Sequence, residues 1–301
     1  MLIDMVKSFV VGIFPRSSKL INIWKRYSRG EISRDVFDQV YREHVKNVVD
    51  LYVEKNLDII HDPQSNWHDH FRPFTRFEGL EAGPLTRFYE NNTFFRRPIF
   101  KDTPRFSEDL LEDYLTIGFD DRVDGISIPG PHMWITHSIF KGVDPLKAIS
   151  ELLRMSIGYF LGIGYHWIFL HEPSIVYYGE DYSKVEKLYE HLKEFRENII
   201  IYPYFGKVNQ SLKLLGEMGF RYSIDMRWNR IGDISGDEGP IILGMVDGQN
   251  TLLEDPIEIK GFISERFSGI DVWICNNVDL DFLPYEYAVK KVEILSGVRG
   301  G

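Results

Sequence analysis

Cysteine is almost missing from this 301-residue sequence, which contains only Cys275. A single cysteine cannot form an internal disulfide, and it cannot supply a zinc site that needs two thiolates from one chain. Glutamine is also scarce, and few Cys and Gln are typical of thermophilic proteins. A chain without a disulfide framework fits a reducing compartment, so we expect a cytoplasmic protein.

Basic residues are outnumbered and long apolar runs are missing. Lys and Arg total 35 against 45 Asp and Glu, and the net charge of −10 argues against nucleic acid, whose phosphates demand a basic surface. Apolar runs such as residues 199–201 and 241–243 are strand-sized, far below the ~20 residues that span a bilayer. No signal-peptide pattern opens the chain. We therefore expect neither a nucleic-acid nor a membrane partner.

The sequence does contain a regular alternation of short apolar runs and longer amphipathic stretches, which predicts β-then-α units around a parallel sheet. No Gly-x-Gly-x-x-Gly turn follows the first strand, and this favours a closed barrel over an open doubly wound sheet. The predicted fold class is α/β, a (β/α)8 TIM barrel in which residues 1–301 form a single domain. The eight predicted strands are residues 10–14, 57–61, 125–128, 166–171, 199–204, 221–225, 241–246 and 271–275.

One stretch interrupts this alternation. Residues 65–104 are polar and aromatic with several turn-forming residues, and they are too many for a plain loop. We expect a hairpin or arm, inserted after the second strand and lying over the barrel mouth. It is either a solvated hairpin packed on the barrel or on a partner chain, or a lid that contacts an anionic substrate. Five arginines favour the lid: Arg72, Arg76, Arg87, Arg96 and Arg97.

Polar residues follow most predicted strands at their carboxyl ends, where barrel enzymes carry their chemistry. Several of these ends also carry Pro or Gly, which let a ligand approach the backbone closely. Together they predict a pocket. The substrate-binding candidates are Arg16, Lys19, Gln64, His132, Tyr202, Tyr204, Asp247 and Asn250, and the catalytic candidates are His171, Glu172 and Asp225.

Short motifs lie at the same strand ends, in a fixed order from about residue 9 to residue 296. They read Val-Gly-Ile-Phe-Pro-Arg at 11–16, Gly-Glu-Ile-Ser at 30–33, Pro-Gly-Pro at 129–131, His-Glu-Pro at 171–173, Tyr-Phe-Gly at 204–206, Asp-Gly-Gln-Asn at 247–250 and Asp-Leu-Asp-Phe-Leu-Pro at 279–284. In these motifs the chain resembles the cobalamin-independent methionine synthase family. The resemblance implies a barrel that serves methionine biosynthesis by methyl transfer to homocysteine.

The resemblance also implies a zinc site whose ligands this chain lacks. Family members hold the homocysteine thiolate on zinc bound by His, Cys, Glu and Cys, because the metal generates the nucleophile at neutral pH. Carried over residue by residue, these ligands fall on Tyr202, Tyr204, near Asp225, and on Val278. The acids that would hold the homocysteine amine are replaced as well, one by His171 and one by Gln64.

The motifs at 204–206 and 247–250 are closer to the family's zinc-free N-terminal barrel, which helps hold the polyglutamate tail of folate. This makes Arg16 and Lys19 candidate contacts for carboxylates. We expect a zinc-less companion subunit with no cofactor of its own. It would bind a separate zinc-bearing methionine synthase barrel, or form a homodimer, and assist with a methyl donor such as a pterin.

Two alternatives stay open. In the first, the chain is a self-standing methyltransferase with a rebuilt site that is either metal-free or His-rich. In a His-rich site the metal ligands would be His68 and His70, with a further ligand from His61, His132 or His171. Glu172 is either a structural turn residue or an acid/base partner of His171. A methyltransferase acting on another thiol, or a uroporphyrinogen-type decarboxylase, shares the fold but has less support, since thiolate ligands and a basic cluster are both missing.

Overall fold

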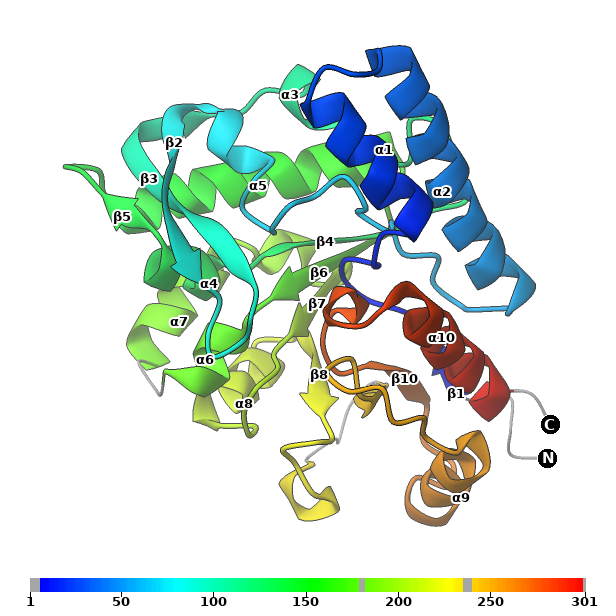
Figure 1. Ribbon diagram of the computed structural model, residues 1–301. Coiled ribbons are helices and arrows are strands. Elements are labelled where there is room, and N and C mark those ends of the chain that lie inside the picture. Colours follow the sequence, from blue (N-terminus) through cyan, green and yellow to red (C-terminus); the bar gives the residue numbers. More distant parts are fainter. Residues whose placement is uncertain (1–5, 179–181, 235–239, 300–301) are drawn as a thin grey trace.

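The computed structural model describes residues 6–178, 182–234 and 240–299. Within them, seven parallel strands form a curled sheet at the centre of the molecule, with helices around its outside (Figure 1). The hydrogen-bonded order is β1-β10-β9-β8-β7-β6-β4. The strands are β1 Val6–Ser8, β4 Gly125–Pro129, β6 Trp167–His171, β7 Ile199–Tyr202, β8 Arg221–Asp225, β9 Ile241–Val246 and β10 Val272–Asn276.

Contacts between distant strands show that this sheet curls on itself. Three strands separate β6 from β10 in the hydrogen-bonded order, yet the rings of Trp167 and Trp273 meet edge to face with centroids 5.3 Å apart. Phe9, just after β1, likewise lies 5.5 Å from Phe169 of β6. Such contacts across the interior pack the core of a barrel with side chains.

Helices begin where the sequence supplies capping residues. Side chains of Ser17, Ser33, Asp144, Asn209 and Asp255 each accept a hydrogen bond from a first-turn amide. No helix in the described ranges is long and apolar enough to cross a membrane. The helices are α1 Ser18–Ser28, α2 Arg34–Glu54, α3 Asp109–Glu112, α4 Pro131–His137, α5 Pro145–Ile163, α6 Pro173–Tyr177, α7 Tyr182–Glu190, α8 Gln210–Glu217, α9 Pro256–Arg266 and α10 Tyr285–Arg299, with 3-10 turns at Phe74–Arg76, Lys193–Phe195, Ile231–Asp233 and Leu280–Phe282.

A second, smaller sheet lies beside the curled one. The strands β2 Glu78–Arg87 and β3 Phe94–Arg105 pair antiparallel, and β3 pairs parallel with β5 Ile139–Phe140. The β2–β3 ribbon lies in the stretch for which the sequence predicts a hairpin or arm, and it runs in front of α4 and α5 (Figure 1). Trp134 of α4 packs against the ribbon, because its ring centroid lies 5.8 Å from that of Phe100 in β3. The same ring lies 4.7 Å from that of Phe71, in the loop before the ribbon.

The first predicted strand is placed too late in the sequence. Residues 10–14 were expected in the sheet, whereas β1 is Val6–Ser8 and the chain leaves the ladder just after it. The reason is a distant side chain: the amide of Val11 donates to Oδ1 of Asn276 (2.9 Å), and its carbonyl accepts from Nδ2 of the same residue (2.7 Å). Gly12 then turns the backbone with a φ of +87°.

The second predicted strand, residues 57–61, is not a regular strand. Ile59 and His61 form isolated parallel bridges, one to the residue after β1 and the other to β4. The amide of Ile60 donates to the carboxylate of Asp124 at 2.7 Å, so a side chain replaces a backbone partner. The described sheet therefore has seven regular strands, which corrects the expected eight, and residues 59–61 lie between its two edges.

Candidate functional site

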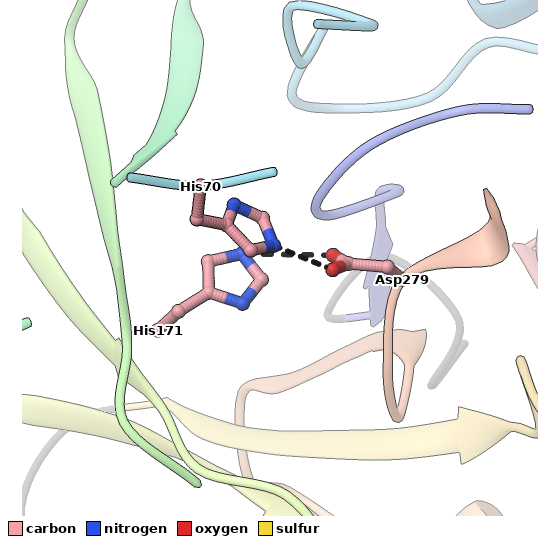
Figure 2. Close-up of side chains that lie close together, drawn as sticks. All are labelled: His70, His171 and Asp279. Atoms are coloured by element: carbon pink, nitrogen blue, oxygen red, sulfur yellow. Dashed lines mark hydrogen bonds and ion pairs between the residues drawn. The ribbon is translucent and has the colours of Figure 1, made fainter. Parts of the chain in front are cut away.

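Two histidines and one carboxylate lie together at the carboxyl end of the curled sheet (Figure 2). His171 ends β6, Asp279 lies three residues beyond β10, and His70 belongs to the loop before β2. Nε2 of His70 is 2.7 Å from Oδ2 of Asp279, and Nε2 of His171 is 3.6 Å from Oδ1 of the same carboxylate. The two imidazole rings are 4.0 Å apart. We call these three residues the histidine cluster.

Burial and mutual charge set the protonation of this cluster. All three side chains are at most 7% exposed. Burial opposes a charged His70, but the Asp279 carboxylate, together with the charges of Asp281 and Asp69, raises the pKa of His70. Burial holds the pKa of His171 well below its ordinary value, and the nearby His70 and His61 lower it further. The cluster thus combines a carboxylate-paired histidine with a neutral imidazole.

Several buried atoms of the cluster lack a hydrogen-bond partner among the described residues. They are Nε2 of His171, Oδ1 of Asp279 and Nδ1 of His70. An unpartnered buried polar atom costs about 1–3 kcal/mol, so folded proteins rarely retain such atoms without a use. The other nitrogen of His171 is engaged, because Nδ1 lies 3.0 Å from the hydroxyl of Tyr204. Two of the unpartnered atoms, Nε2 of His171 and Oδ1 of Asp279, therefore face each other at 3.6 Å.

Gly12 makes room for this arrangement. A Cβ at this position would overlap the carboxylate of Asp279, and the φ of +87° is one that side-chain-bearing residues rarely adopt. The amide of Asp281 donates to the carbonyl of Ile13 at 3.1 Å, which ties the loop after β10 to the same turn. The glycine of the Val-Gly-Ile-Phe-Pro-Arg motif thus lets the two chain segments meet.

A small pocket opens onto the cluster. Its volume is about 40 Å³, and its walls include His70, Asp279, Asp281 and aromatic residues of the β2–β3 ribbon, among them Phe88 and Phe95. This volume holds an ion with a bound water, whereas pockets for drug-sized ligands run to about 300–1,000 Å³. This pocket is too small for a ligand as large as a pterin.

The neighbouring strand ends are used differently. The hydroxyl of Tyr202 donates to the backbone carbonyl of Asn276. Asp225 accepts from Nδ2 of Asn277 at 3.1 Å and from the amide of Phe205 at 3.3 Å. Burial raises the pKa of the Asp225 carboxyl to about 6 although these hydrogen bonds lower it. We call Tyr202, Asp225, Asn276 and Asn277 the tyrosine–aspartate network.

Comparison with known proteins gives one relative by sequence and several by structure. No protein-family model matches the chain. A methionine synthase of Sulfolobus acidocaldarius is 19% identical over 324 residues, covering 99% of this chain and 92% of that protein. A Listeria monocytogenes protein described as a vitamin-B12-independent methionine synthase has 16% identity and a TM-score of 0.75, covering 98% of each chain. The resemblance to the cobalamin-independent methionine synthases is confirmed.

Two further solved structures share this fold. A B12-independent methionine synthase of Shewanella sp. W3-18-1, in complex with selenomethionine, has 12% identity and a TM-score of 0.70 and covers 99% of this chain and 97% of its own. A methyltransferase of Methanosarcina mazei has 15% identity and a TM-score of 0.61, with 98% and 94% covered. At these identities the structures establish the shared fold, while the motifs and the sequence relative link the chain to methionine synthases.

The family's zinc does not fit the residues found here. Tyr202 and Tyr204 offer buried phenols that are already hydrogen-bonded, and Val278 offers no ligand atom. The one thiol, Cys275, is fully buried near the carbonyl of Leu243, and burial raises its pKa far above the ordinary value. Zinc of the family type needs thiolate and imidazole donors, so the network cannot hold it.

Glu172 has the contacts of a structural residue. Its buried carboxylate accepts from the amides of His132 (2.8 Å) and Met133 (2.9 Å) at the start of α4, and from the hydroxyl of Tyr189 (3.1 Å). Burial raises the pKa of Glu172 to about 8. The carboxylate holds α4 against β6, and these contacts agree with the turn interpretation. His132 itself lies with Nδ1 2.9 Å from the hydroxyl of Ser174.

Three candidates near the N-terminal half are engaged within the fold. Arg16 donates from Nε to the carbonyl of Ser65 at 2.7 Å and lies over the ring of Trp24. Lys19 is exposed and pairs with Glu43 at 2.7 Å. Gln64 is buried and donates to the carbonyl of Ser127 at 2.8 Å. A role of these residues in binding a carboxylate or a substrate stays a prediction.

The remaining candidates lie apart from the cluster. Asp247 pairs with Arg227 at 2.5 Å and accepts a hydrogen bond from the side-chain Nδ2 of Asn250. His68 is exposed and packs on Trp24 with ring centroids 5.0 Å apart; it lines the pocket, but it is not one of the three clustered residues. Of the candidates taken from the sequence, the structure brings together His70, His171, Tyr204 and Tyr202, whose ring packs edge to face on His171 with centroids 5.2 Å apart.

Asp279 is the site residue that the sequence analysis missed. It was noticed only as the first residue of the Asp-Leu-Asp-Phe-Leu-Pro motif. A signal was present, since the motif follows the last predicted strand and so starts at the same end of the barrel as His171. Its contact with His70 spans 209 positions of the chain, a pairing that no local pattern indicates.

Proposed function

We propose that this chain acts in methyl transfer of the methionine synthase type as a zinc-less companion subunit. It would bind a separate zinc-bearing methionine synthase barrel and assist in binding the methyl donor. The observation that carries the proposal is the tyrosine–aspartate network: two of the positions where the resemblance places zinc ligands carry Tyr202 and Asp225, and both are buried and hydrogen-bonded to neighbouring residues. The proposal includes a complete (β/α)8 barrel, with residues 59–61 in place of the eighth strand and residues 65–104 as an inserted arm.

The chemistry of thiol methylation supports this division of work. The thiol of homocysteine is mostly protonated at neutral pH, and a thiolate-binding metal raises the fraction of nucleophile. Neither the phenol of Tyr202 nor the carboxylate of Asp225 can replace a zinc–thiolate set, because each already has partners in the protein. A chain with this network therefore depends on another barrel for thiolate activation.

The test is homocysteine methyl transfer by the purified chain, first alone and then mixed with a zinc-bearing methionine synthase barrel from the same source. We expect no transfer by the chain alone. Transfer by the zinc-bearing barrel should appear or rise when the chain is added, and an equal amount of an inert protein serves as the control. Turnover by the chain alone would overturn the companion role, as would a mixture no more active than the zinc-bearing barrel by itself.

A second candidate is a self-standing methyltransferase with a rebuilt site. The histidine cluster favours it, because unpartnered ligand atoms lie beside a pocket at the carboxyl end of the barrel. The same assay separates the two candidates. A self-standing enzyme transfers methyl groups without the second barrel and loses that activity on His171→Ala, whereas a companion shows no activity to lose.

A further inference from the structure

We infer that the histidine cluster is a binding site for a divalent transition-metal ion of the zinc type. The ligands are Nε2 of His70, Nε2 of His171 and the carboxylate of Asp279, which lie on the three segments shown in Figure 2. The site is distinct from the positions of the family's zinc ligands. It differs from the expectation that the chain binds no cofactor, and it stands whether the chain acts alone or as a companion.

The ligand atoms are nearly in place. Each residue offers one atom, and the three atoms all lie within 4.8 Å of one another. A tetrahedral ion bound at about 2.0–2.1 Å sets neighbouring ligand atoms about 3.3 Å apart. Nε2 of His70 lies 2.7 Å from Oδ2 of Asp279, and Nε2 of His171 lies 3.6 Å from Oδ1, so the carboxylate presents one oxygen to each histidine at a separation near that value.

Two of these ligands present unpartnered atoms to each other. Nε2 of His171 and Oδ1 of Asp279 lack hydrogen-bond partners within the described residues, and their side chains are 0% and 4% exposed. Their separation of 3.6 Å is too long for a hydrogen bond. An ion between them would give both atoms a partner without requiring a proton on either. This second observation, independent of residue type, points to a ligand.

Residues behind the ligands hold them in the orientation that an ion requires. The hydroxyl of Tyr204 lies 3.0 Å from Nδ1 of His171, so Nδ1 can carry the proton while the lone pair of Nε2 faces Asp279. Gly12 leaves the space that the Asp279 carboxylate occupies. The resemblance places a zinc-binding cysteine at Tyr204. In this chain the residue at that position orients His171, which is a ligand of the inferred site.

The donor set selects the class of ion. Two imidazoles and one carboxylate suit Zn²⁺, Fe²⁺ or Co²⁺, whereas Ca²⁺ and Mg²⁺ prefer oxygen ligands alone. Three protein ligands leave a coordination position open, as in zinc sites that bind a water or a substrate. The pocket of about 40 Å³ adjoins His70 and Asp279, and it is large enough for such a water.

Nearby histidines are excluded from the ligand set by their contacts. His68, the other half of the His-x-His pair, packs on Trp24 and lines the pocket, but it does not belong to the group of ligand atoms that lie within 4.8 Å of one another. Nε2 of His61 lies 2.6 Å from the hydroxyl of Ser127, and its other ring nitrogen contacts a backbone carbonyl. The geometry therefore assigns the site to His70, His171 and Asp279.

The test is metal binding by the full chain after removal of bound metal with a chelator. Zn²⁺ alone and Co²⁺ alone are titrated by calorimetry, and the visible absorption of the Co²⁺ form is recorded. We expect one ion per chain and the intense Co²⁺ bands of a four- or five-coordinate site. His171→Ala and Asp279→Asn should each weaken binding by at least about tenfold. His68→Ala is the matched control and should bind as the wild type does.

Absence of stoichiometric binding by the wild-type chain would overturn the inference, as would His171→Ala and Asp279→Asn variants that bind as tightly as the wild type. Circular dichroism establishes that each variant is folded. If a ligand variant does not fold, the wild-type titration and the Tyr204→Phe variant decide, since the latter keeps every ligand and should weaken binding about tenfold. Binding is measured without homocysteine, so failure of the companion role and failure of the metal site are separate results.

Discussion

The histidine cluster and the tyrosine–aspartate network lie side by side at the carboxyl end of the same sheet, yet they use their polar atoms in opposite ways. In the network, the hydroxyl of Tyr202 and both oxygens of Asp225 have partners inside the protein. In the cluster, His171 and Asp279 each keep an unpartnered buried atom. Tyr204 lies between the two regions, since it follows β7 and bonds to His171.

This contrast shows how a shared fold can keep its scaffold while its binding chemistry moves. Saturated hydrogen bonds stabilise a buried polar group, and unsatisfied ones cost free energy that selection tolerates only where the atoms have a use. By that criterion the network now supports the fold, although the resemblance places the family's metal there. The cluster begins on the neighbouring strand β6, and its unpartnered buried atoms are typical of a binding site.

The largest expected effect is the loss of stability when a side chain at position 12 displaces the Asp279 carboxylate of the cluster. Gly12→Ala adds a Cβ where the Asp279 carboxylate lies, at a φ of +87°. We expect the free energy of unfolding to fall by about 4 kcal/mol, of which about 1–2 comes from the backbone conformation and the rest from overpacking. Urea denaturation measures the loss.

Gly30→Ala is the matched control for that change. Gly30 has a similar φ of +71°, but nothing lies within 4 Å of a Cβ built there. Its substitution therefore carries only the backbone cost of about 1–2 kcal/mol. Equal losses for the two variants would mean that Gly12 does not hold the space for Asp279.

Strands that are bounded by local signals were predicted well from the sequence. The predicted strands 221–225 and 241–246 have the observed bounds of β8 and β9, and 125–128 and 271–275 are within one residue at each end. Three of them are mainly apolar runs, and 221–225, which reads Arg-Tyr-Ser-Ile-Asp, alternates polar and apolar residues. The start of the barrel was predicted poorly because its backbone groups bind distant side chains: Val11 binds Asn276, 265 positions away, and Ile60 binds Asp124. No local pattern contains that information.

The residues of the candidate site also differ in whether a local pattern could predict them. His171 and Tyr204 were found because they end strands, and strand ends converge in a barrel. His70 was noticed for its His-x-His spacing, but the expected partner His68 lies elsewhere. Asp279 joins only when the curled sheet brings the loop after β10 to the loop before β2, which is a consequence of tertiary structure.

An effect of intermediate size is expected in how stability depends on pH, and it tests the tyrosine–aspartate network. Burial holds the pKa of Asp225 at about 6, above its ordinary value of 3.8, with the Asp247 charge adding to the rise. A raised folded-state pKa means that Asp225 contributes stability below pH 3.8 and loses it as the pH rises through 6. Arg227 faces this site as well, paired with Asp247. Asp225→Asn does not titrate, so its stability relative to the wild type should rise between pH 4 and pH 7.

The size of that change follows from the shift in pKa. A difference of 2.2 between 6 and 3.8, at 1.36 kcal/mol per unit, gives at most about 3 kcal/mol. Denaturation of both proteins at several pH values measures the slope, which is insensitive to any hydrogen bond lost equally at every pH. A difference that is flat from pH 4 to pH 7 would contradict the burial assigned to Asp225.

The smallest effect compares two tyrosines of one strand end. Tyr202→Phe removes the hydroxyl that donates to the carbonyl of Asn276, and Tyr204→Phe removes the hydroxyl that contacts Nδ1 of His171. Both side chains are buried and keep their rings, so each variant should lose about 1–2 kcal/mol of unfolding free energy. Thermal or urea denaturation measures that loss, and stability alone does not separate the two regions.

The affinity for Zn²⁺ distinguishes the Tyr202→Phe and Tyr204→Phe variants. Tyr204→Phe frees the ring of His171 to turn and should weaken binding about tenfold, whereas Tyr202→Phe lies in the saturated network and should change it by less than about twofold. Equal effects of the two substitutions would mean that the regions act as one site. A tenfold difference between variants of equal stability would establish that the hydroxyl of Tyr204 serves the ligand, while that of Tyr202 serves the fold.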